Sequence, residues 1–280
     1  MVSEAGAATP GTLHIVSTPI GNLGDLSARA VEVLRGVAAV LAEDTRHTRV
    51  LCDRFDIRTP LVAYHEHNEA KATPGLVARL RAGDSLALVS DAGTPLLSDP
   101  GSRLVRAAIE AGVPVSPVPG ASALLAALAG AGLATDRFTF FGFLARKGGE
   151  RTRTVAEVAA LPHTAVLYEA PGRVGETLAD LEAAGAGGRE AVVARELTKQ
   201  FEEFRRGTVA ELARYYGEHE ARGEVVLLVA GAPAATADEA TLRERAAALR
   251  AEGVSAREVM RVLMETAHAP RNLAYRIAHE

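Results

Sequence analysis

The chain contains one cysteine among its 280 residues, no tryptophan and only three lysines. A single cysteine excludes an internal disulfide and argues against a cysteine-based zinc site. Because Cys52 stands at helical spacing from Thr48 and Phe55, we expect its thiol to be packed in or near the core. The positive charge is nearly all arginine, and the net charge is −4. No global basic field therefore points to nucleic acid, and any such contact must come from a local patch.

Long apolar runs and the common nucleotide-binding motifs are also absent from the sequence. No apolar stretch approaches the length that crosses a bilayer, and the first eleven residues lack the apolar core of a signal peptide. We therefore expect a cytoplasmic protein without membrane contact. No Gly-x-Gly-x-x-Gly follows the first expected strand, and neither a Gly-Lys-Ser/Thr loop nor a serine-nucleophile elbow occurs. These gaps argue against an ordinary dinucleotide fold, a P-loop enzyme and a serine hydrolase.

The first half of the chain repeats one pattern five times: an apolar strand, a glycine-rich or polar loop, and a helix. The length and the 48% hydrophobic content allow two domains and a small appendage. The expected strands are 13–17, 37–41, 61–64, 86–89 and 113–118, and the expected helices are 28–35, 45–55, 74–82, 102–111 and 124–131. This alternation predicts a mostly parallel α/β layer with its polar loops on one rim.

The second half has strands that follow one another more closely, with helices interposed, which is typical of an α+β domain. The expected strands are 138–143, 165–168, an antiparallel pair at 191–197 and 201–206, and 225–229, and the expected helices are 150–160, 174–184 and 209–216. A linker by composition then leads to three helical patterns, in which seven Arg stand against five Glu from Thr241 onward. We therefore expect three units, at residues 12–133, 134–233 and 238–280.

Residues 90–101, after the fourth expected strand, hold two Asp, two Pro and two Gly. Ligands of open α/β sheets bind beyond the carboxyl ends of the strands, so carboxylates here can serve a small, partly cationic ligand. The same residue types also form plain turns, and taken alone the stretch fits a strand-to-helix turn slightly better.

A second polar cluster, after the third expected strand, contains His65, Glu66, His67 and Glu69. Alternation along a strand end places the two histidines on the same side, but no third strong ligand accompanies them. The pattern favours a hydrogen-bonding cleft cluster over a metal centre, and we expect no metal.

Eight motifs in a fixed order extend over almost the whole chain. They are STPIGNL (17–23), EDTR (43–46), YHEHNE (64–69), SDAGTPLLSDPG (90–101), PGASA (119–123), FGFL (141–144), YEAPGR (168–173) and ARELTK (194–199). Together they closely resemble the tetrapyrrole methylase superfamily and, within it, the ribosomal RNA small subunit methyltransferase I family. Several motifs in order are far more specific than any one of them.

The resemblance implies a homodimeric enzyme that binds S-adenosylmethionine (SAM) in a cleft between two domains. It further implies methylation of the ribose 2′-OH of a cytidine in 16S rRNA, within the small ribosomal subunit. Two alternatives stay open: SAM-dependent methylation of a precorrin-type tetrapyrrole, and a non-catalytic RNA-binding assembly factor. The basic C-terminal segment and the EDTR motif argue against the first, and the polar loops at successive strand ends argue against the second.

The same resemblance suggests which residues form the SAM cradle. These are Pro19, Asp91, Ala92, Gly93, Leu96 and Ser122 from the first domain, and Phe143, Leu144, Tyr168, Ala230 and Gly231 from the second. Asp91 is then interpreted as the ligand-side carboxylate of residues 90–101. Asp99, next to Pro100 at the start of a helix, is interpreted as a helix cap.

A ribose hydroxyl is a poor nucleophile, so a general base or a cation that stabilises the alkoxide would assist it. We place Asp44 and Arg46 first for this role, with Lys199 beside them, and Glu43, Glu66, Glu169 and Glu196 as further candidates on the rim. Cations that can meet RNA are Arg46, Arg49, Arg54, Arg146, Lys147, Arg173, Arg195 and Lys199, together with Arg257, Arg261, Arg271 and Arg276 of the C-terminal segment. That segment is equally compatible with a solvated three-helix cap.

Overall fold

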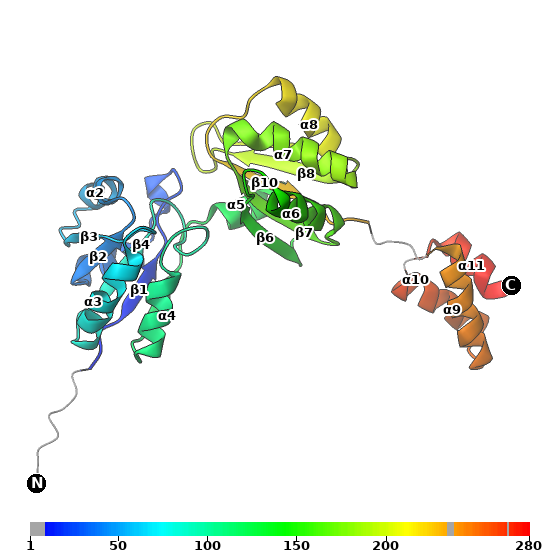
Figure 1. Cartoon of the computed structure of the whole chain (residues 1–280), viewed down its shortest axis with the longest axis horizontal. Coiled ribbons are helices and arrows are strands. Elements are labelled where there is room, and N and C mark those ends of the chain that lie inside the picture. The colour runs from blue at the N-terminus through cyan, green and yellow to red at the C-terminus, as the bar shows by residue number, and fades with distance from the viewer. Residues whose placement is uncertain (1–8, 234–237, 268) are drawn as a thin grey trace, which may run out of the picture.

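A computed structural model describes residues 9–233, 238–267 and 269–280 of the chain. Its first half forms a five-stranded sheet in the order β3-β2-β4-β1-β5, in which every neighbouring pair is parallel (Figure 1). The elements are β1 (Leu13–Val16), η1 (Leu23–Asp25), α1 (Ala28–Gly36), β2 (Ala39–Ala42), α2 (Thr45–Arg54), β3 (Leu61–Ala63), α3 (Glu69–Arg81), β4 (Leu86–Val89), α4 (Ser102–Glu110), β5 (Val115–Val118) and α5 (Ala123–Ala131). The expected fivefold alternation and the parallel layer are confirmed.

Helices cover both faces of this sheet, as the short apolar strands require. All four residues of β2 and of β4 are buried, which is typical of central parallel strands. Leu34 of α1 and Cys52 of α2 belong to the core on one face, and Leu80 of α3 and Leu104 of α4 belong to the core on the other. The thiol of Cys52 is fully buried, as its helical spacing predicted.

One expected boundary is wrong: α3 begins at Glu69 rather than near Pro74, which lies inside the helix. Proline is most easily placed in the first turn, so its position suggested a later start. A turn forms before it because the carbonyl of Asn68 accepts from the amides of Lys71 and Ala72, and the Thr73 hydroxyl donates to the Glu69 carbonyl. Proline then removes only its own hydrogen bond from an established helix.

The second half forms another five-stranded sheet, in the order β6-β7-β10-β8-β9. Its elements are β6 (Phe138–Phe143), α6 (Gly149–Ala160), β7 (Thr164–Glu169), η2 (Pro171–Arg173), α7 (Val174–Leu181), η3 (Glu182–Ala186), β8 (Glu190–Arg195), β9 (Glu203–Thr208), α8 (Val209–Glu218) and β10 (Val225–Val229). Only β6 and β7 are parallel, and β10 runs antiparallel to both of its neighbours. The expected antiparallel pairing of β8 with β9 is confirmed. Their connection spans 196–202, longer than expected, because Glu196 and Thr198 leave the strand with positive φ angles.

Helix α5 connects the two sheets, and it is apolar on nearly all sides (Figure 1). Leu124 and Leu128 of α5 belong to one buried cluster with Val166, Val192 and Leu228 of the second sheet, while α6, α7 and α8 cover the opposite face. A helix that is hydrophobic all round needs burial on several sides, which a place between two domains supplies. The domain boundary near residue 133 stays a prediction.

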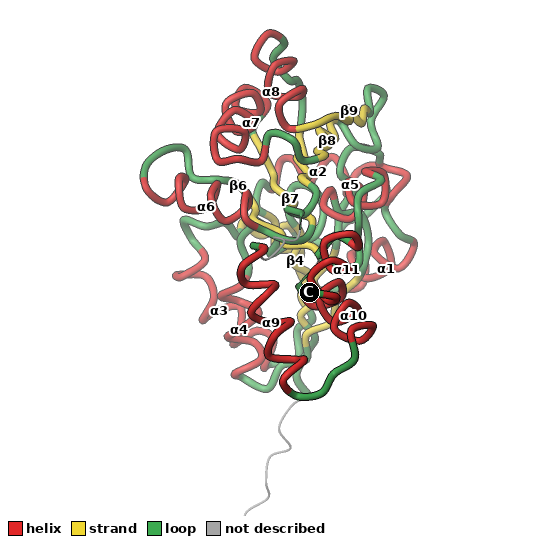
Figure 2. Tube along the Cα trace, turned by 90° about the vertical axis from the view of Figure 1, so that its right-hand side faces the viewer, coloured by secondary structure: helices red, strands yellow, loops and turns green. Residues whose placement is uncertain are grey.

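The C-terminal helices α9 (Glu239–Ala251), α10 (Ala256–Thr266) and α11 (Arg271–His279) form a small unit with its own core. Leu242, Val259, Leu263 and Ile277 are buried at that core. Ser255 caps α10 by accepting from the amide of Glu258. Figure 1 shows the unit apart from both sheets, and in Figure 2 it faces the viewer. Among the described residues, no helix has the length and apolarity needed to cross a membrane.

Candidate active site

A cavity of about 350 Å³ lies where loops of both sheets meet. The first domain contributes the loop after β1, the loop after β4 and the start of α5. The second domain contributes the carboxyl ends of β6 and β7, the residue after Glu196 and the amino end of β10. The lining residues are Ile20, Asp91, Ala92, Gly93, Thr94, Leu97, Ser98, Asp99, Ala123, Phe143, Tyr168, Glu169, Ala170, Pro171, Leu197, Gly223, Glu224, Val225 and Val226.

Hydrogen bonds hold the first-domain loops in register. Thr18 and Gly93 exchange both backbone hydrogen bonds, at 2.8 and 3.0 Å. The Thr18 hydroxyl donates to the Ser90 carbonyl at 3.1 Å, and the Thr94 hydroxyl donates to the carbonyl of Ala121 at 3.2 Å. The loops after β1, β4 and β5 are therefore linked, and they present one continuous surface to the cavity.

Several carboxylates gather at the carboxyl ends of β2, β3 and β4. The side chain of Asp91 accepts a hydrogen bond of 3.0 Å from the backbone amide of Asp44. Burial raises the pKa of Glu43, and the negative charges of Asp99, Asp91 and Glu66 raise it further. Asp91, Asp99 and Glu66 therefore lie within electrostatic reach of Glu43.

Asp99 lines the cavity, and its interpretation as a helix cap is wrong. The residue at the N-cap of α4 is Gly101, and the structure shows no side-chain hydrogen bond capping that helix. Ser98 and Gly101 have positive φ angles of 70° and 130°, so the chain turns sharply on both sides of Asp99 before α4 begins. Burial raises the pKa of Asp99 to about 6; the Ser90 hydroxyl opposes this rise, and the negative charge of Asp91 adds to it.

Two aromatic side chains form the second-domain wall of the cavity. The rings of Phe143 and Tyr168 lie 5.6 Å apart between centroids, and Tyr168 also meets Phe140 edge-on at 4.8 Å. Burial raises the pKa of the Tyr168 hydroxyl, and the negative charge of Asp99, which lines the same cavity, adds to the rise. Phe143 is 58% exposed, which leaves its ring free to meet a ligand.

Beneath this wall lies a buried network centred on Glu169, whose side chain is fully buried. Its two oxygens accept from the Ala170 amide at 2.9 Å and from the Thr177 hydroxyl at 2.6 Å. The Thr177 oxygen in turn accepts from Arg151, which pairs with Asp180. These bonds fix the end of β7 where it meets the cavity.

The predicted SAM-cradle residues fall into two groups. Asp91, Ala92, Gly93, Phe143 and Tyr168 line the cavity. The others lie outside its lining and are Pro19, Leu96, Ser122, Leu144, Ala230 and Gly231. Pro19 and Ser122 are each next to a lining residue.

Three residues of the second group lie clearly elsewhere. Leu144 is 3% exposed and belongs to the core of the second domain, where its carbonyl accepts from Arg173. Ala230 and Gly231 follow the carboxyl end of β10, whereas the cavity meets its amino end at residues 223–226. Because β10 is antiparallel to β7, the carboxyl end of β10 lies beside the amino end of β7, away from the cavity.

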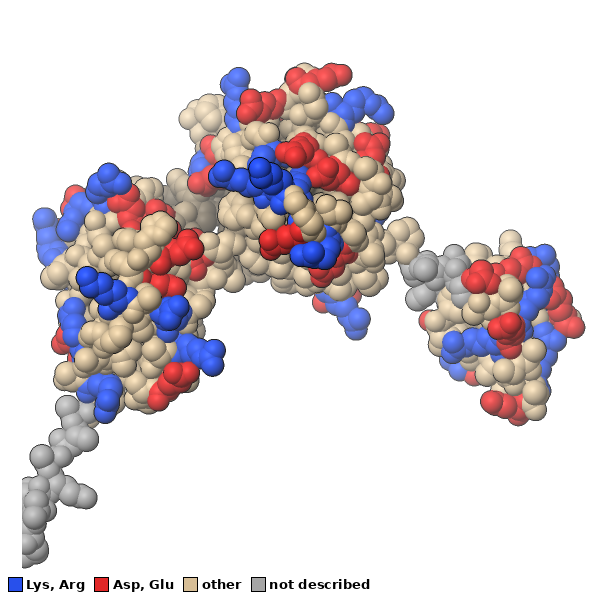
Figure 3. All heavy atoms as spheres, in the orientation of Figure 1, with Lys and Arg blue, Asp and Glu red and all other residues tan. Residues whose placement is uncertain are grey.

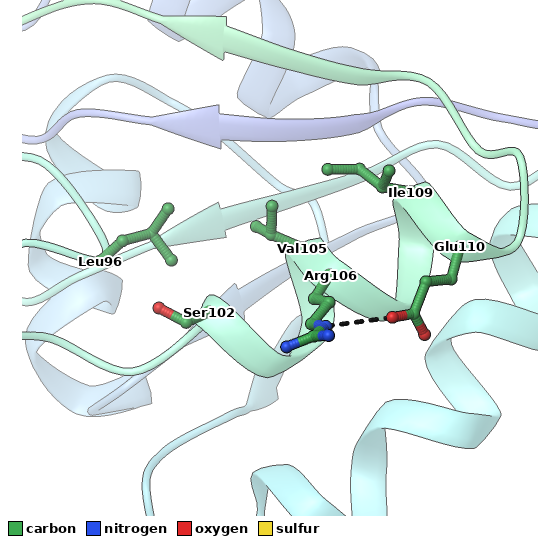
Figure 4. Close-up of a pocket in the computed structure, with 6 residues that line it drawn as sticks. All are labelled: Leu96, Ser102, Val105, Arg106, Ile109 and Glu110. Atoms are coloured by element: carbon green, nitrogen blue, oxygen red, sulfur yellow. Dashed lines mark hydrogen bonds and ion pairs between the residues drawn. The ribbon is translucent and has the colours of Figure 1, made fainter.

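Leu96 borders a separate, open hollow of about 380 Å³ beside α4 (Figure 4). The figure shows its side chain near Ser102 and Val105, with Arg106 hydrogen-bonded to Glu110 at 3.0 Å. Leu96 has a φ of 78°, and its side chain packs against the core cluster that contains Leu104 of α4.

The predicted catalytic residues lie at the rim. Asp44 caps α2 and pairs with Arg46 at 2.7 Å, and this exposed pair lies outside the cavity lining. Hydrogen bonds from Arg46 hold the pKa of Asp44 well below its usual range. The Lys199 ammonium pairs with Glu196 at 2.9 Å and with Glu224 at 3.1 Å. Burial opposes the rise, but these two partners raise the pKa of Lys199.

The cavity lining also contains residues that were not predicted from the sequence, among them Ile20, Thr94, Leu197 and residues 223–226. Ile20 and Leu197 lie inside the motifs STPIGNL and ARELTK, so the neighbouring motif residues could have indicated that these two lie near the cavity. No feature of the sequence marked residues 223–226 as cavity residues, because the sequence of an apolar strand does not reveal in which direction the strand runs in the sheet. Where the chain is described, no three His, Cys, Asp or Glu side chains are grouped as metal ligands; His65 and His67 approach to 6.0 Å between ring centroids.

Comparisons with known proteins agree with this architecture. Residues 12–213 match the family of tetrapyrrole (corrin/porphyrin) methylases. The chain is 46% identical over 273 residues to the ribosomal RNA small subunit methyltransferase I of Synechocystis sp., covering 96% of this chain and 98% of that one. It is 50% identical over 269 residues to the protein of the same name from Xylella fastidiosa, covering 95% and 98%.

Solved structures match at the level of the fold. Uroporphyrin-III C-methyltransferase from Thermus thermophilus, complexed with S-adenosyl homocysteine, has a TM-score of 0.57 and 22% identity, covering 79% of this chain and 97% of that one. A diphthine synthase has a TM-score of 0.61 and 15% identity, covering 79% and 89%.

Proposed function

Because this chain belongs to the tetrapyrrole methylase family, and within it to the ribosomal RNA small subunit methyltransferase I group, we propose that it transfers a methyl group from SAM to rRNA. The acceptor we propose is the ribose 2′-OH of a cytidine in 16S rRNA, presented in the small ribosomal subunit. The observation that carries the proposal is the cavity between the domains, whose lining contains four carboxylates and neither lysine nor arginine.

The lining suits SAM chemically. SAM carries a sulfonium cation, an ammonium group and an adenine, so carboxylates, an apolar surface and aromatic rings are favourable partners. Asp91, Asp99 and Glu224 supply the negative charge, while Phe143 and Tyr168 offer faces on which a flat heterocycle can lie.

An unpartnered polar group beside the cavity supports the same fit. The Ser122 hydroxyl is buried and has no hydrogen-bond partner among the described residues, although it stands at the N-cap position of α5. Its neighbour Ala123 lines the cavity. Buried polar groups are normally paired, so this hydroxyl fits a site that a polar ligand completes.

The catalytic contribution of the protein is then mainly positioning. When bound, SAM supplies the methyl group. The linked loops after β1, β4 and β5 fix the first-domain side of the cavity, and the Glu169 network fixes the second-domain side. Holding two reactants in line can supply a large part of the acceleration in a displacement reaction. The walls of Ile20, Leu97, Val225 and Val226 exclude water from the reacting groups.

RNA contact requires cations whose charge is not neutralised inside the protein. Arg173 is mostly buried and donates to the carbonyls of Leu144 and Ala145, and Arg195 pairs with Glu203 at 2.6 Å. With Lys199 paired as well, the predicted cations of the two sheet domains with no ion pair among the described residues are Arg49, Arg54, Arg146 and Lys147. Figure 3 shows basic and acidic side chains interspersed over the face in view, without one large basic patch, and we propose a local contact with RNA.

The C-terminal unit offers fewer cations than its composition suggests. Arg243, Arg261 and Arg276 pair with glutamates on the same unit. Arg257 and Arg271 have no ion-pair partner where the chain is described, and we assign them to flanking RNA. A homodimer is proposed from the family resemblance, and sedimentation of the purified chain tests it.

One experiment tests the function. The protein is incubated with SAM labelled in the methyl group and with 30S subunits, naked 16S rRNA or a precorrin. We expect label on the ribose of the rRNA, most efficiently in assembled 30S subunits. Asp91→Asn should reduce labelling, whereas the exposed and distant Asp56→Asn should not. Label on the precorrin would favour a tetrapyrrole methylase, and no label on any acceptor would favour a non-catalytic assembly factor.

A further inference from the structure

Three loops of the second domain lie at one edge of its sheet, beside the cavity. Strands β6, β7 and β8 run in the same direction and β10 runs opposite to them, so their carboxyl ends share an edge with its amino end. The loops at this edge span residues 144–148, 196–202 and 219–224, and we call them the second-domain rim. Leu197, Gly223 and Glu224 of the rim line the cavity. The second-domain rim can therefore contact a substrate that extends out of the cavity on this side.

Two of these loops are bonded to each other and form one ordered surface. The amide of Glu196 donates to the Glu224 carbonyl at 3.0 Å, and the amide of Glu224 donates to the Glu196 side chain at 3.1 Å. The Lys199 ammonium bridges the two carboxylates at 2.9 and 3.1 Å, which compensates part of their negative charge. The loop 196–202 is thereby fixed against the loop 219–224.

The loop 196–202 presents an aromatic ring to solvent. Phe201 is 66% exposed, and no other large hydrophobic side chain among the residues that the structure describes is more exposed. The turn that carries it is ordered, because the Thr198 amide donates to the Glu202 side chain at 2.7 Å and the Glu202 amide donates to the Lys199 carbonyl at 3.2 Å. Four residues earlier, Leu197 is buried and lines the cavity. The ring is therefore held near the cavity by a loop that needs little further ordering to bind a partner.

The second-domain rim also carries cations that the protein does not neutralise. Arg222 is exposed next to the lining residue Gly223, and its other neighbour, Ala221, is buried and anchors the loop. Arg146 and Lys147 are exposed in the loop 144–148. None of these three cations has an ion pair where the chain is described. Such free charges are what the phosphates of an RNA strand require.

We propose that the second-domain rim binds the rRNA strand that flanks the methyl acceptor, with Phe201 stacked on an unpaired base and Arg222 bound to a phosphate. This inference rests on the proposed function. Proteins bind single-stranded RNA by stacking its bases on aromatic rings and by neutralising its backbone with arginine or lysine, and the rim combines both beside the cavity. One exposed ring among charged side chains is too small an apolar surface for the core of a protein–protein interface, which favours RNA over a second copy of this chain.

The test separates stacking from charge by the salt dependence of binding. Filter binding measures the Kd for 16S rRNA between about 50 and 200 mM salt for the wild-type protein, Phe201→Ala, Phe201→Trp and Arg222→Ala. Phe201→Ala should raise this Kd about 5- to 100-fold at every salt concentration, because a stacking contact is lost, and Phe201→Trp should keep the wild-type affinity. Arg222→Ala should raise the Kd and reduce the slope of log K against log salt by about 0.7, which corresponds to one phosphate contact on a single strand.

Matched controls lie at the opposite edge of the same sheet. Arg137 and Phe138 stand at the amino end of β6, both are exposed, and Arg137 has no ion pair among the described residues. Arg137→Ala and Phe138→Ala should leave the Kd for 16S rRNA within about twofold of the wild-type value. Calorimetry should show a Kd for SAM within about threefold of the wild-type value in every variant, because none of these side chains lines the cavity.

The inference is overturned if Phe201→Ala affects rRNA binding no more than Phe138→Ala, if Arg222→Ala leaves the salt slope unchanged, or if SAM affinity falls in step with rRNA affinity. A sedimentation rate that falls to that of a smaller species in Phe201→Ala would assign the ring to a contact between two copies of the chain and would also overturn it. Binding is measured without methyl transfer, so the two proposals fail separately. Wild-type protein that binds rRNA but labels no acceptor contradicts only the proposed function, and wild-type protein that labels rRNA without the expected effects at Phe201 and Arg222 contradicts only the role of the rim.

Discussion

Replacing Thr177 with Val removes one hydroxyl from the buried network behind the cavity. Valine has nearly the same shape, so the change leaves little empty space and isolates the hydrogen bonds. The lost hydroxyl donates to Glu169 at 2.6 Å and accepts from Arg151 at 3.1 Å. Thr177 itself is fully buried, so water cannot easily replace the missing partner.

The expected effect can be worked out partner by partner. Arg151 keeps a partner, because the same nitrogen pairs with Asp180 at 2.7 Å. Glu169 keeps the hydrogen bond from the Ala170 amide and its ion pair with Arg173 at 3.5 Å, both at one oxygen. It loses the hydrogen bond at its second oxygen, in a side chain with no solvent exposure. A hydrogen bond to a charged group contributes about 1.5–3 kcal/mol, and an unsatisfied buried charge costs more. We therefore expect Thr177→Val to lower the free energy of unfolding by about 3 kcal/mol.

Urea unfolding monitored by circular dichroism measures this change. The matched control is Thr154→Val on α6, whose exposed hydroxyl donates only to the Glu150 carbonyl, and its effect should stay within about 0.5 kcal/mol. A double-mutant cycle with Glu169→Gln should give a coupling energy above about 1 kcal/mol. A destabilisation below about 1 kcal/mol for Thr177→Val would show that the network does not hold the end of β7 in place.

Three further predictions concern the rim and the C-terminal unit. Gly21→Ala should destabilise the protein by about 1–3 kcal/mol and displace the Lys199 side chain. The φ of Gly21 is 153°, and a Cβ there would lie 2.4 Å from Lys199 Cγ. Thermal unfolding measures the loss of stability. Asp44→Asn should lower the methyl-transfer rate roughly tenfold with SAM affinity nearly intact, and equal loss of both in kinetics and calorimetry would contradict the substrate-side role. Combining Arg257→Glu with Arg271→Glu should weaken rRNA binding and reduce its salt dependence by about two counterions in filter binding, without changing the Kd for SAM.

The first sheet could be predicted from sequence because its signals are local. Apolar strands such as 86–89 alternate with helices, and a parallel sheet gathers the carboxyl ends of its strands at one rim. The position of Asp91 follows from that rule alone. Asp99 could not be placed in the same way, because the chain around it turns at Ser98 and Gly101, which have positive φ angles and pack closely against Gly142 and Leu88. Short-range capping rules do not include such contacts.

The second sheet shows where the rule about carboxyl ends stops applying. Tyr168, the second-last residue of β7, lines the cavity, whereas Ala230, directly after β10, does not. Strand β10 pairs antiparallel with β7, with Val225 opposite Glu169 and Val229 opposite Ala165, so its amino end shares the edge where β7 ends. The carbonyl of Ala230 instead accepts from the buried Arg189, which ties the far end of the strand to α6 through Val158. In a mixed sheet, the residues that reach a site therefore depend on strand direction, which is set by pairing partners distant in sequence rather than by the strand itself.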